Sequence, residues 1–163
     1  MCNLLARCLL ALGAPLSLLA CTGDQHETPL QVASAWARAT PPGATVGAMY
    51  FDIENRGSAD KLLRVETPVS SRAELHNTTH ADDRMQMRAA EGLDIPARDI
   101  VKLQPGGLHV MLVELKQPLR EGESVPATLI FAKAQPLSIN VPVAAIGAQG
   151  APGTDAVGLS HQH

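Results

Sequence analysis

The feature that most constrains this chain is a succession of short runs with alternating apolar residues, separated by turns rich in Gly and Pro. No segment between the turns keeps a 3.6-residue apolar period over ten or more residues, so helices are not expected. Turn sequences such as Asn55-Arg56-Gly57 and Pro105-Gly106-Gly107 punctuate the runs. This pattern predicts an all-β antiparallel sandwich or barrel. The expected strands are Gln31–Ala37, Val46–Glu54, Lys61–Glu66, Arg72–His76, Arg84–Arg88, Ile100–Leu103, Leu108–Leu115, Ala127–Phe131 and Leu137–Val143.

Composition narrows the function classes. The chain has 163 residues, with 13 Lys and Arg against 16 Asp and Glu, which gives no electrostatic reason to expect nucleic acid as a partner. One Trp, one Tyr and two Phe are too few for the stacking surfaces of single-strand binders. An apolar content of 45% is typical of a packed soluble domain.

The N-terminus reads as an export signal. Arg7 is followed by an apolar run from residue 8 to residue 20, which is too short to span a bilayer but suits a secretory signal. The run ends Leu18-Leu19-Ala20-Cys21, which resembles the lipobox of bacterial lipoproteins. That resemblance implies cleavage before Cys21 and diacylation of its thiol. The alternatives are a secreted protein cleaved nearby and an uncleaved anchor.

Four segments are therefore expected. They are a signal peptide (1–20), a tether (21–29), one β-sandwich domain (30–143) and a flexible tail (144–163). With the thiol of Cys21 carrying lipid, the mature chain has no free thiol, so any soft-metal chemistry must use methionine sulfur.

Histidine and methionine gather in one part of the sequence. His109 and Met111 are two residues apart on one expected strand, so their side chains leave the same face. The Pro105-Gly106-Gly107 turn directly before them would place His109 near a rim of the sandwich. Imidazole with neutral thioether favours Cu(I) and is rare in zinc sites. On the residues alone, methionine as core filler and histidine as an ordinary surface side chain stay open.

The spacing of four residues resembles the periplasmic PCu(A)C copper-chaperone family: His76, Met87, His109 and Met111. The surrounding segments Glu74-Leu75-His76, Met85-Gln86-Met87-Arg88 and Leu103–Leu112 are also similar to that family. So are Leu119–Glu123, Ala35–Thr40 and Ile53–Gly57. The likeness covers roughly residues 30 to 143.

This resemblance implies a cupredoxin-like β-sandwich that binds one Cu(I) through those four side chains. It implies a non-enzymatic chaperone, expected to be a monomer, that delivers copper to the copper-site subunit of cytochrome oxidase with a Sco-type assembly protein. The lipobox places it at the periplasmic side of a bacterial membrane. Thr22, standing where an Asp signals inner-membrane retention, favours the outer membrane.

Further histidines and one further methionine are auxiliary candidates. Met85 is interpreted as a core residue or a neighbour of the ligands, and His80 as an exposed loop residue, with an auxiliary ligand as the alternative. His161 and His163, joined by His26, are candidates for a weaker Cu(II) site, because imidazole nitrogen suits Cu(II).

Two other functions remain open at this stage. Copper storage or detoxification would need the same site as delivery. A sandwich lipoprotein that binds a protein partner without metal would make the His and Met positions incidental.

Overall fold

In the computed structural model, residues 29–81 and 84–153 are described, and they contain ten strands and no helix. The strands are β1 (Leu30–Arg38), β2 (Val46–Asn55), β3 (Asp60–Glu66), β4 (Ser70–Ala81), β5 (Arg84–Ala89), β6 (Leu93–Ile95), β7 (Ile100–Leu103), β8 (Leu108–Leu115), β9 (Ser124–Phe131) and β10 (Leu137–Ala144).

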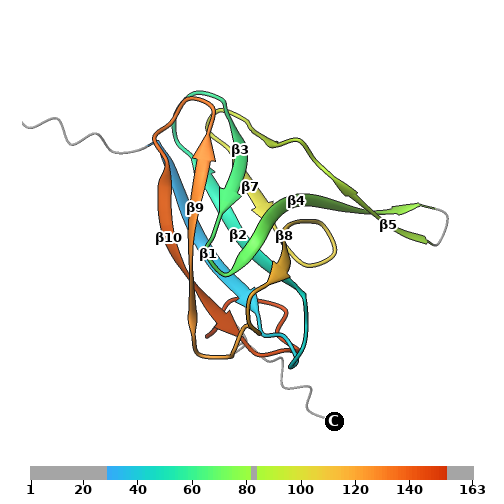
Figure 1. The fold of residues 1–163 in the computed structure, drawn as a ribbon. Helices are drawn as coiled ribbons and strands as arrows, with labels where there is room; N and C mark the ends of the chain where they lie inside the picture. The colour runs from blue at the N-terminus through green and yellow to red at the C-terminus, as the bar shows by residue number, and fades with distance from the viewer. Residues whose placement is uncertain (1–28, 82–83, 154–163) are drawn as a thin grey trace, which may run out of the picture.

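The strands form two layers that share β10. One layer runs β5-β4-β8-β2-β1, with β7 also paired to β2, and the other runs β10-β9-β3-β6 (Figure 1). β10 joins them, because residues 137–142 pair with β9 while Val143 and Ala144 pair with Ala37 and Arg38 of β1. The predicted all-β sandwich is confirmed. The β1–β10 pair is parallel, and every other described pair is antiparallel.

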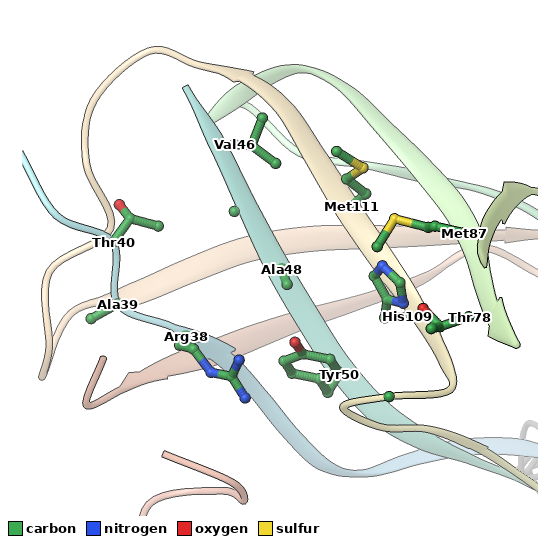
Figure 2. A pocket seen from close by; sticks show the side chains of 12 residues that line it. Arg38, Ala39, Thr40, Val46, Ala48, Tyr50, Thr78, Met87, His109 and Met111 are labelled. Carbon is green, nitrogen blue, oxygen red and sulfur yellow. The ribbon is translucent and has the colours of Figure 1, made fainter. Parts of the chain in front are cut away.

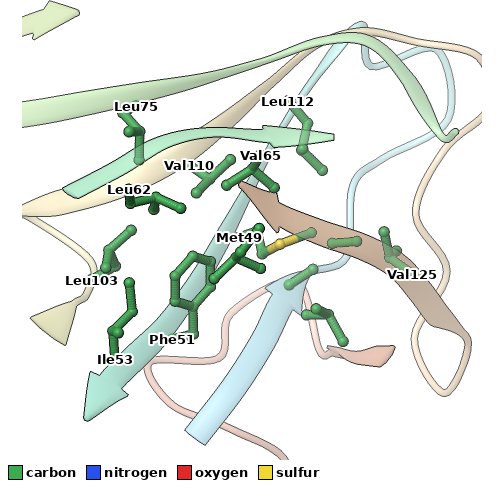
Figure 3. Close-up of a cluster of buried hydrophobic side chains, with 14 of the residues drawn as sticks. Met49, Phe51, Ile53, Leu62, Val65, Leu75, Leu103, Val110, Leu112 and Val125 are labelled. Atoms are coloured by element: carbon green, nitrogen blue, oxygen red, sulfur yellow. The ribbon is translucent and has the colours of Figure 1, made fainter. Parts of the chain in front are cut away.

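Alternating residues of β2 divide the two sides of its layer. Met49, Phe51 and Ile53 are fully buried between the layers, where they pack with Leu62 of β3 and Val110 of β8 (Figure 3). Burial of such side chains stabilises the fold by roughly 1.5–3 kcal/mol each. The intervening residues of β2 face outward, on the side that carries the candidate site.

A bulge in β1 sets which of its residues face outward. Ala33 pairs with Asp52 and Trp36 with Tyr50, so β1 holds one more residue than β2 over this stretch. Ser34 takes a φ of 52° at the bulge. Because of this extra residue, Trp36 lies opposite Tyr50 on the outer face, with ring centroids 4.5 Å apart.

All nine expected strands are present, and β7 and β8 have the expected bounds. The sequence pattern did not predict β6, which is only three residues long. The predicted strand Arg72–His76 was shorter than β4, which extends to Ala81. β4 continues through Asn77-Thr78-Thr79-His80 because that segment pairs with β5, and Thr is favoured on a pleated surface. The placement of His80 in a loop is therefore wrong: its backbone lies in β4, paired with Met85.

The β4–β5 hairpin projects from the sandwich (Figure 1). The side chains of His80 and Met85, near its end, lie outside the described residues, as do Cys21, His26, His161 and His163. The structural character of residues 1–28 and 154–163, including the expected signal peptide, therefore stays a prediction.

The segment after β10 differs from the expected flexible tail as far as residue 153. Ala148 is buried with Trp36 and Tyr50, and its carbonyl accepts a hydrogen bond from Arg38 Nε at 3.1 Å. The apolar rings on the outer face explain why this stretch packs, since they would otherwise meet water. Across the described stretches of chain, no helix is long and apolar enough to cross a bilayer.

Candidate metal centre

The candidate site lies on the outer face of three adjacent strands, β5, β4 and β8. His76 of β4 is the direct cross-strand partner of His109 of β8, and the ring centroids are 5.9 Å apart. Met111 lies two residues after His109 and so shares its face. Met87 of β5 pairs with Thr78, two residues after His76, and therefore also lies on this face. The register thus brings the four residues of the predicted spacing to one face.

A tight turn holds His109 in one tautomer. Gly107 N donates to the Gln104 carbonyl at 3.1 Å, and Gly106 takes a φ of 79°, a conformation that favours glycine. The turn places the Gly107 carbonyl 3.0 Å from Nδ1 of His109. A carbonyl only accepts, so Nδ1 carries the proton and Nε2 keeps a free lone pair.

His76 is oriented by a carboxylate instead. Its Nε2 donates to Glu74 at 3.1 Å, since an ionised carboxylate only accepts. Its Nδ1 is buried and has no hydrogen-bond partner in the described part of the chain. A buried acceptor without a partner is costly. The neutral ring therefore offers Nδ1 as a lone pair that a metal ion would satisfy.

Glu74 is held in turn by Arg72. Arg72 Nε donates to the Glu74 carboxylate at 3.1 Å, and its Nη1 donates to Glu114 at 3.1 Å. The hydrogen bond from His76, followed by that from Arg72, lowers the pKa of Glu74. The carboxylate therefore stays ionised and continues to accept the His76 proton.

The four side chains differ in exposure. His109 is 7% exposed and the His76 side chain 13%, whereas Met87 is 52% exposed. Met111 is half-buried beside the strand pair β8–β2, where it lies opposite Ala48. The imidazoles are thus held inside the rim, and one thioether faces solvent.

A cavity of about 410 Å³ adjoins the cluster. Met87, Met111 and His109 line one end, and Arg38, Ala39 and Thr40 line the other (Figure 2). Tyr50 lies between them, 6.3 Å from His109 by ring centroids. Burial raises the pKa of Tyr50, partly offset by the nearby Arg38 charge, so its hydroxyl stays protonated at neutral pH.

Hard-metal chemistry is not favoured at this site. Within residues 29–81 and 84–153, no three His, Cys, Asp or Glu side chains are grouped to hold a metal ion. A four-ligand centre here needs the two thioethers, which suit a soft monovalent ion better than zinc or calcium.

Sequence reasoning missed three residues of this region. Glu74 precedes His76 by two positions on a strand, a spacing that already predicts a shared face. Tyr50 alternates with the buried Met49 and Phe51 of β2, which already indicates the outer face. Arg38 carried no such signal, because its place in the cavity depends on the bulge in β1.

The arrangement is a β-sandwich of the kind found in PCuAC domains, with a His/Met cluster at its rim. The apo PCuAC domain of PmoF2 is 26% identical, with a TM-score of 0.65 over 76% of this chain and 95% of that domain. The solution structure of CuI-DR1885 from Deinococcus radiodurans is 33% identical, with a TM-score of 0.60 over 76% of this chain and 83% of that protein.

The chain belongs to the LpqE-like lipoprotein family, whose model matches residues 30–143. A protein of Leifsonia xyli subsp. xyli (strain CTCB07) named as a lipoprotein, Lxx21020, is 35% identical over 124 residues, or 75% of this chain and 74% of that protein. The resemblance to the PCu(A)C family and to bacterial lipoproteins, predicted from the sequence, is confirmed, and so is the predicted cupredoxin-like fold.

Proposed function

We propose that this protein is an extracytoplasmic Cu(I) chaperone that carries one ion on His76, Met87, His109 and Met111. The observation that carries the proposal is the pair of oriented imidazoles beside two thioethers. Two rings bound to one ion through nitrogen lie up to about 6.5 Å apart by centroid, given metal–nitrogen distances near 2 Å. The 5.9 Å separation of His76 and His109 meets that limit.

The ligand types favour Cu(I) over competing ions. Met87 and Met111 supply soft, neutral sulfur, which Cu(II) and zinc use poorly. The imidazoles add affinity and make binding pH-dependent, because a protonated ring cannot bind metal. A relative whose structure is named CuI-DR1885 supports the same ion here.

Exposure of the site suits transfer. Met87 is half exposed on an edge strand, so an incoming ligand can reach the ion from that side. Exchange then proceeds by replacing one His or Met at a time, with no change in oxidation state and no catalysed covalent step. We therefore propose a carrier and not an enzyme.

The binding step is tested by titrating the full chain in detergent with Cu(I) against a competing chelator. We expect one ion per chain, with mixed nitrogen and sulfur ligation in X-ray absorption. Glu74→Gln should weaken binding about 10- to 100-fold by releasing the orientation of His76. A parent protein that fails to compete for Cu(I) contradicts the proposal and favours a lipoprotein that binds a protein partner.

We further propose delivery to the copper-site subunit of cytochrome oxidase alongside a Sco-type partner, from the periplasmic side of a bacterial membrane. Membership of a lipoprotein family supports the location, and the PCuAC likeness supports copper handling. A deletion strain should lose oxidase activity at low copper and recover it when copper is added. Unchanged oxidase activity with increased copper sensitivity would instead indicate detoxification.

A further inference from the structure

Arg38 carries a charge that no described residue neutralises. Its Nε donates to the Ala148 carbonyl at 3.1 Å, and its Cζ lies 5.5 Å from the Trp36 ring centroid and 5.6 Å from that of Tyr50. Its Nη2 is buried and has no hydrogen-bond partner in the described residues, and no carboxylate there forms an ion pair with it. A partly buried guanidinium charge without a counterion is costly, so an anion bound beside it in the cavity is favoured.

The same cavity wall offers a second donor. Tyr50 makes no hydrogen bond with any residue in the described ranges. Figure 2 shows its hydroxyl beside the Arg38 guanidinium, away from the thioethers of Met87 and Met111. A cationic fork and a hydroxyl donor on one wall form a receptor for an anion.

The remaining walls limit the kind of anion. Ala39, Val46 and Ala48 line the cavity with apolar surface, and the volume of about 410 Å³ lies in the lower range of small-ligand pockets. One guanidinium balances one negative charge, which suits a monoanion better than a dianion. A carboxylate has two acceptor oxygens, so it can accept one hydrogen bond from the guanidinium and one from the Tyr50 hydroxyl.

We propose that this cavity binds a small organic carboxylate, with its carboxylate group on Arg38 and Tyr50 and its aliphatic part against Val46 and Ala48. The site goes beyond the proposed copper function and needs no metal. Carboxylate binding can therefore be tested independently of Cu(I) binding.

The test uses butyrate, with the metal-free full chain in detergent. Calorimetry should detect butyrate binding, and the neutral isostere butyramide should bind at least about ten-fold more weakly. In ¹H–¹⁵N spectra the Arg38 Nε–H resonance should shift on addition of butyrate. That readout needs no variant and so does not depend on how a substitution affects folding.

Two substitutions locate the site. Arg38→Gln should weaken butyrate binding at least about ten-fold, and Tyr50→Phe, which keeps the ring against Trp36, about three-fold or more. Arg64→Gln is the matched control, because Arg64 is exposed on β3 and already paired with Glu66 at 2.8 Å, so binding should not change. Equal binding of butyramide and butyrate, tighter binding of phosphate, or no shift at Arg38 would overturn the proposal.

Discussion

Glu74 accepts a hydrogen bond from Nε2 of His76 at 3.1 Å, which leaves the buried Nδ1 of that ring without a partner in the described chain. Through this bond the partly exposed Glu74 carboxylate fixes which imidazole nitrogen of His76 is free. His109 reaches the same result with a backbone carbonyl, that of Gly107. The two rings are thus oriented by independent groups, one on β4 and one in the turn before β8.

Substitution of Met87 or Met111 should affect Cu(I) binding, whereas substitution of the core methionine Met49 should not. Met87→Leu and Met111→Leu should each weaken Cu(I) binding about ten-fold or more, because Leu keeps the volume but offers no ligand atom. Met49→Leu is the matched control, since Met49 is fully buried between the layers. Chelator competition measures all three variants. Wild-type affinity in Met111→Leu would remove Met111 from the ligand set.

Met85 provides a second comparison within the same hairpin. Met85→Ala should weaken Cu(I) binding less than Met111→Ala, because Met111 lies two residues from His109 on β8 and belongs to the four-residue spacing, whereas Met85 pairs with His80 further along the hairpin. Both variants should stay folded, with a loss of roughly 1–3 kcal/mol of stability at most. A larger copper defect in Met85→Ala would make Met85 a ligand.

Glu74 should give the metal-free protein a pH-dependent stability. Its pKa is lowered in the folded state by the hydrogen bonds from His76 and Arg72, so its contribution is present above its ordinary value of 4.5 and is lost as the pH falls through the lowered pKa. Urea unfolding should show wild type more stable than Glu74→Gln at pH 6, with the difference shrinking below about pH 4.5. A difference that grows on acidification would contradict this sign.

The turn before His109 depends on one glycine conformation. Gly106 has a φ of 79° and open space around its Cα, so Gly106→Ala should cost about 1 kcal/mol from backbone strain alone. Gly147→Ala is the control, since Gly147 also has open space and no positive φ. Thermal or urea unfolding compares the two. Equal stability of both variants would show that the turn does not require glycine at position 106.

The anchor prediction concerns Cys21. Cys21→Ser should abolish lipidation and move the protein from the membrane fraction to the soluble fraction, because stable anchoring takes more than one acyl chain. Mass spectrometry of the wild-type chain should show the added lipid, and separation of inner from outer membranes tests the outer-membrane expectation drawn from Thr22. Wild-type protein that is soluble and unmodified would exclude the lipoprotein anchor.

The terminal histidines carry a separate prediction. Deleting residues 159–163 should remove a weak Cu(II) signal in electron paramagnetic resonance and leave Cu(I) affinity intact, because His161 and His163 offer imidazole nitrogen without a thioether. His26→Ala tests whether the other end of the chain contributes. Unchanged Cu(II) stoichiometry after the deletion would exclude a metal site in the tail.

Local sequence patterns predicted much of the fold. The alternation in Leu108–Leu115 and the turn before it predicted β8 and placed His109 and Met111 on one face, and the structure has both features. The polar segment after His76 has no apolar alternation, so its pairing with β5 could not be read locally. β6 pairs with β3 over three residues only, too few to leave a pattern.

The cavity beside the His/Met cluster could not be predicted from the sequence, because its lining depends on a bulge in β1. Side chains on a strand alternate, so one extra residue in β1 decides which way every later residue faces. The bulge between Ala33 and Trp36 brings Arg38 to the outer face. Nothing in the run Ala33-Ser34-Ala35 marks it as a bulge.

The projecting β4–β5 hairpin would allow an ion bound at the proposed site to be released without unfolding of the domain. β8 is clasped between β4 and β2, whereas β5 has β4 as its one neighbour in the described sheet. An ion held by all four side chains would lose Met87 when β5 peels locally from β4, with the sandwich layers intact. The rate of ion release would then depend on local opening of the β4–β5 hairpin, and a partner that binds this hairpin would control the rate of transfer.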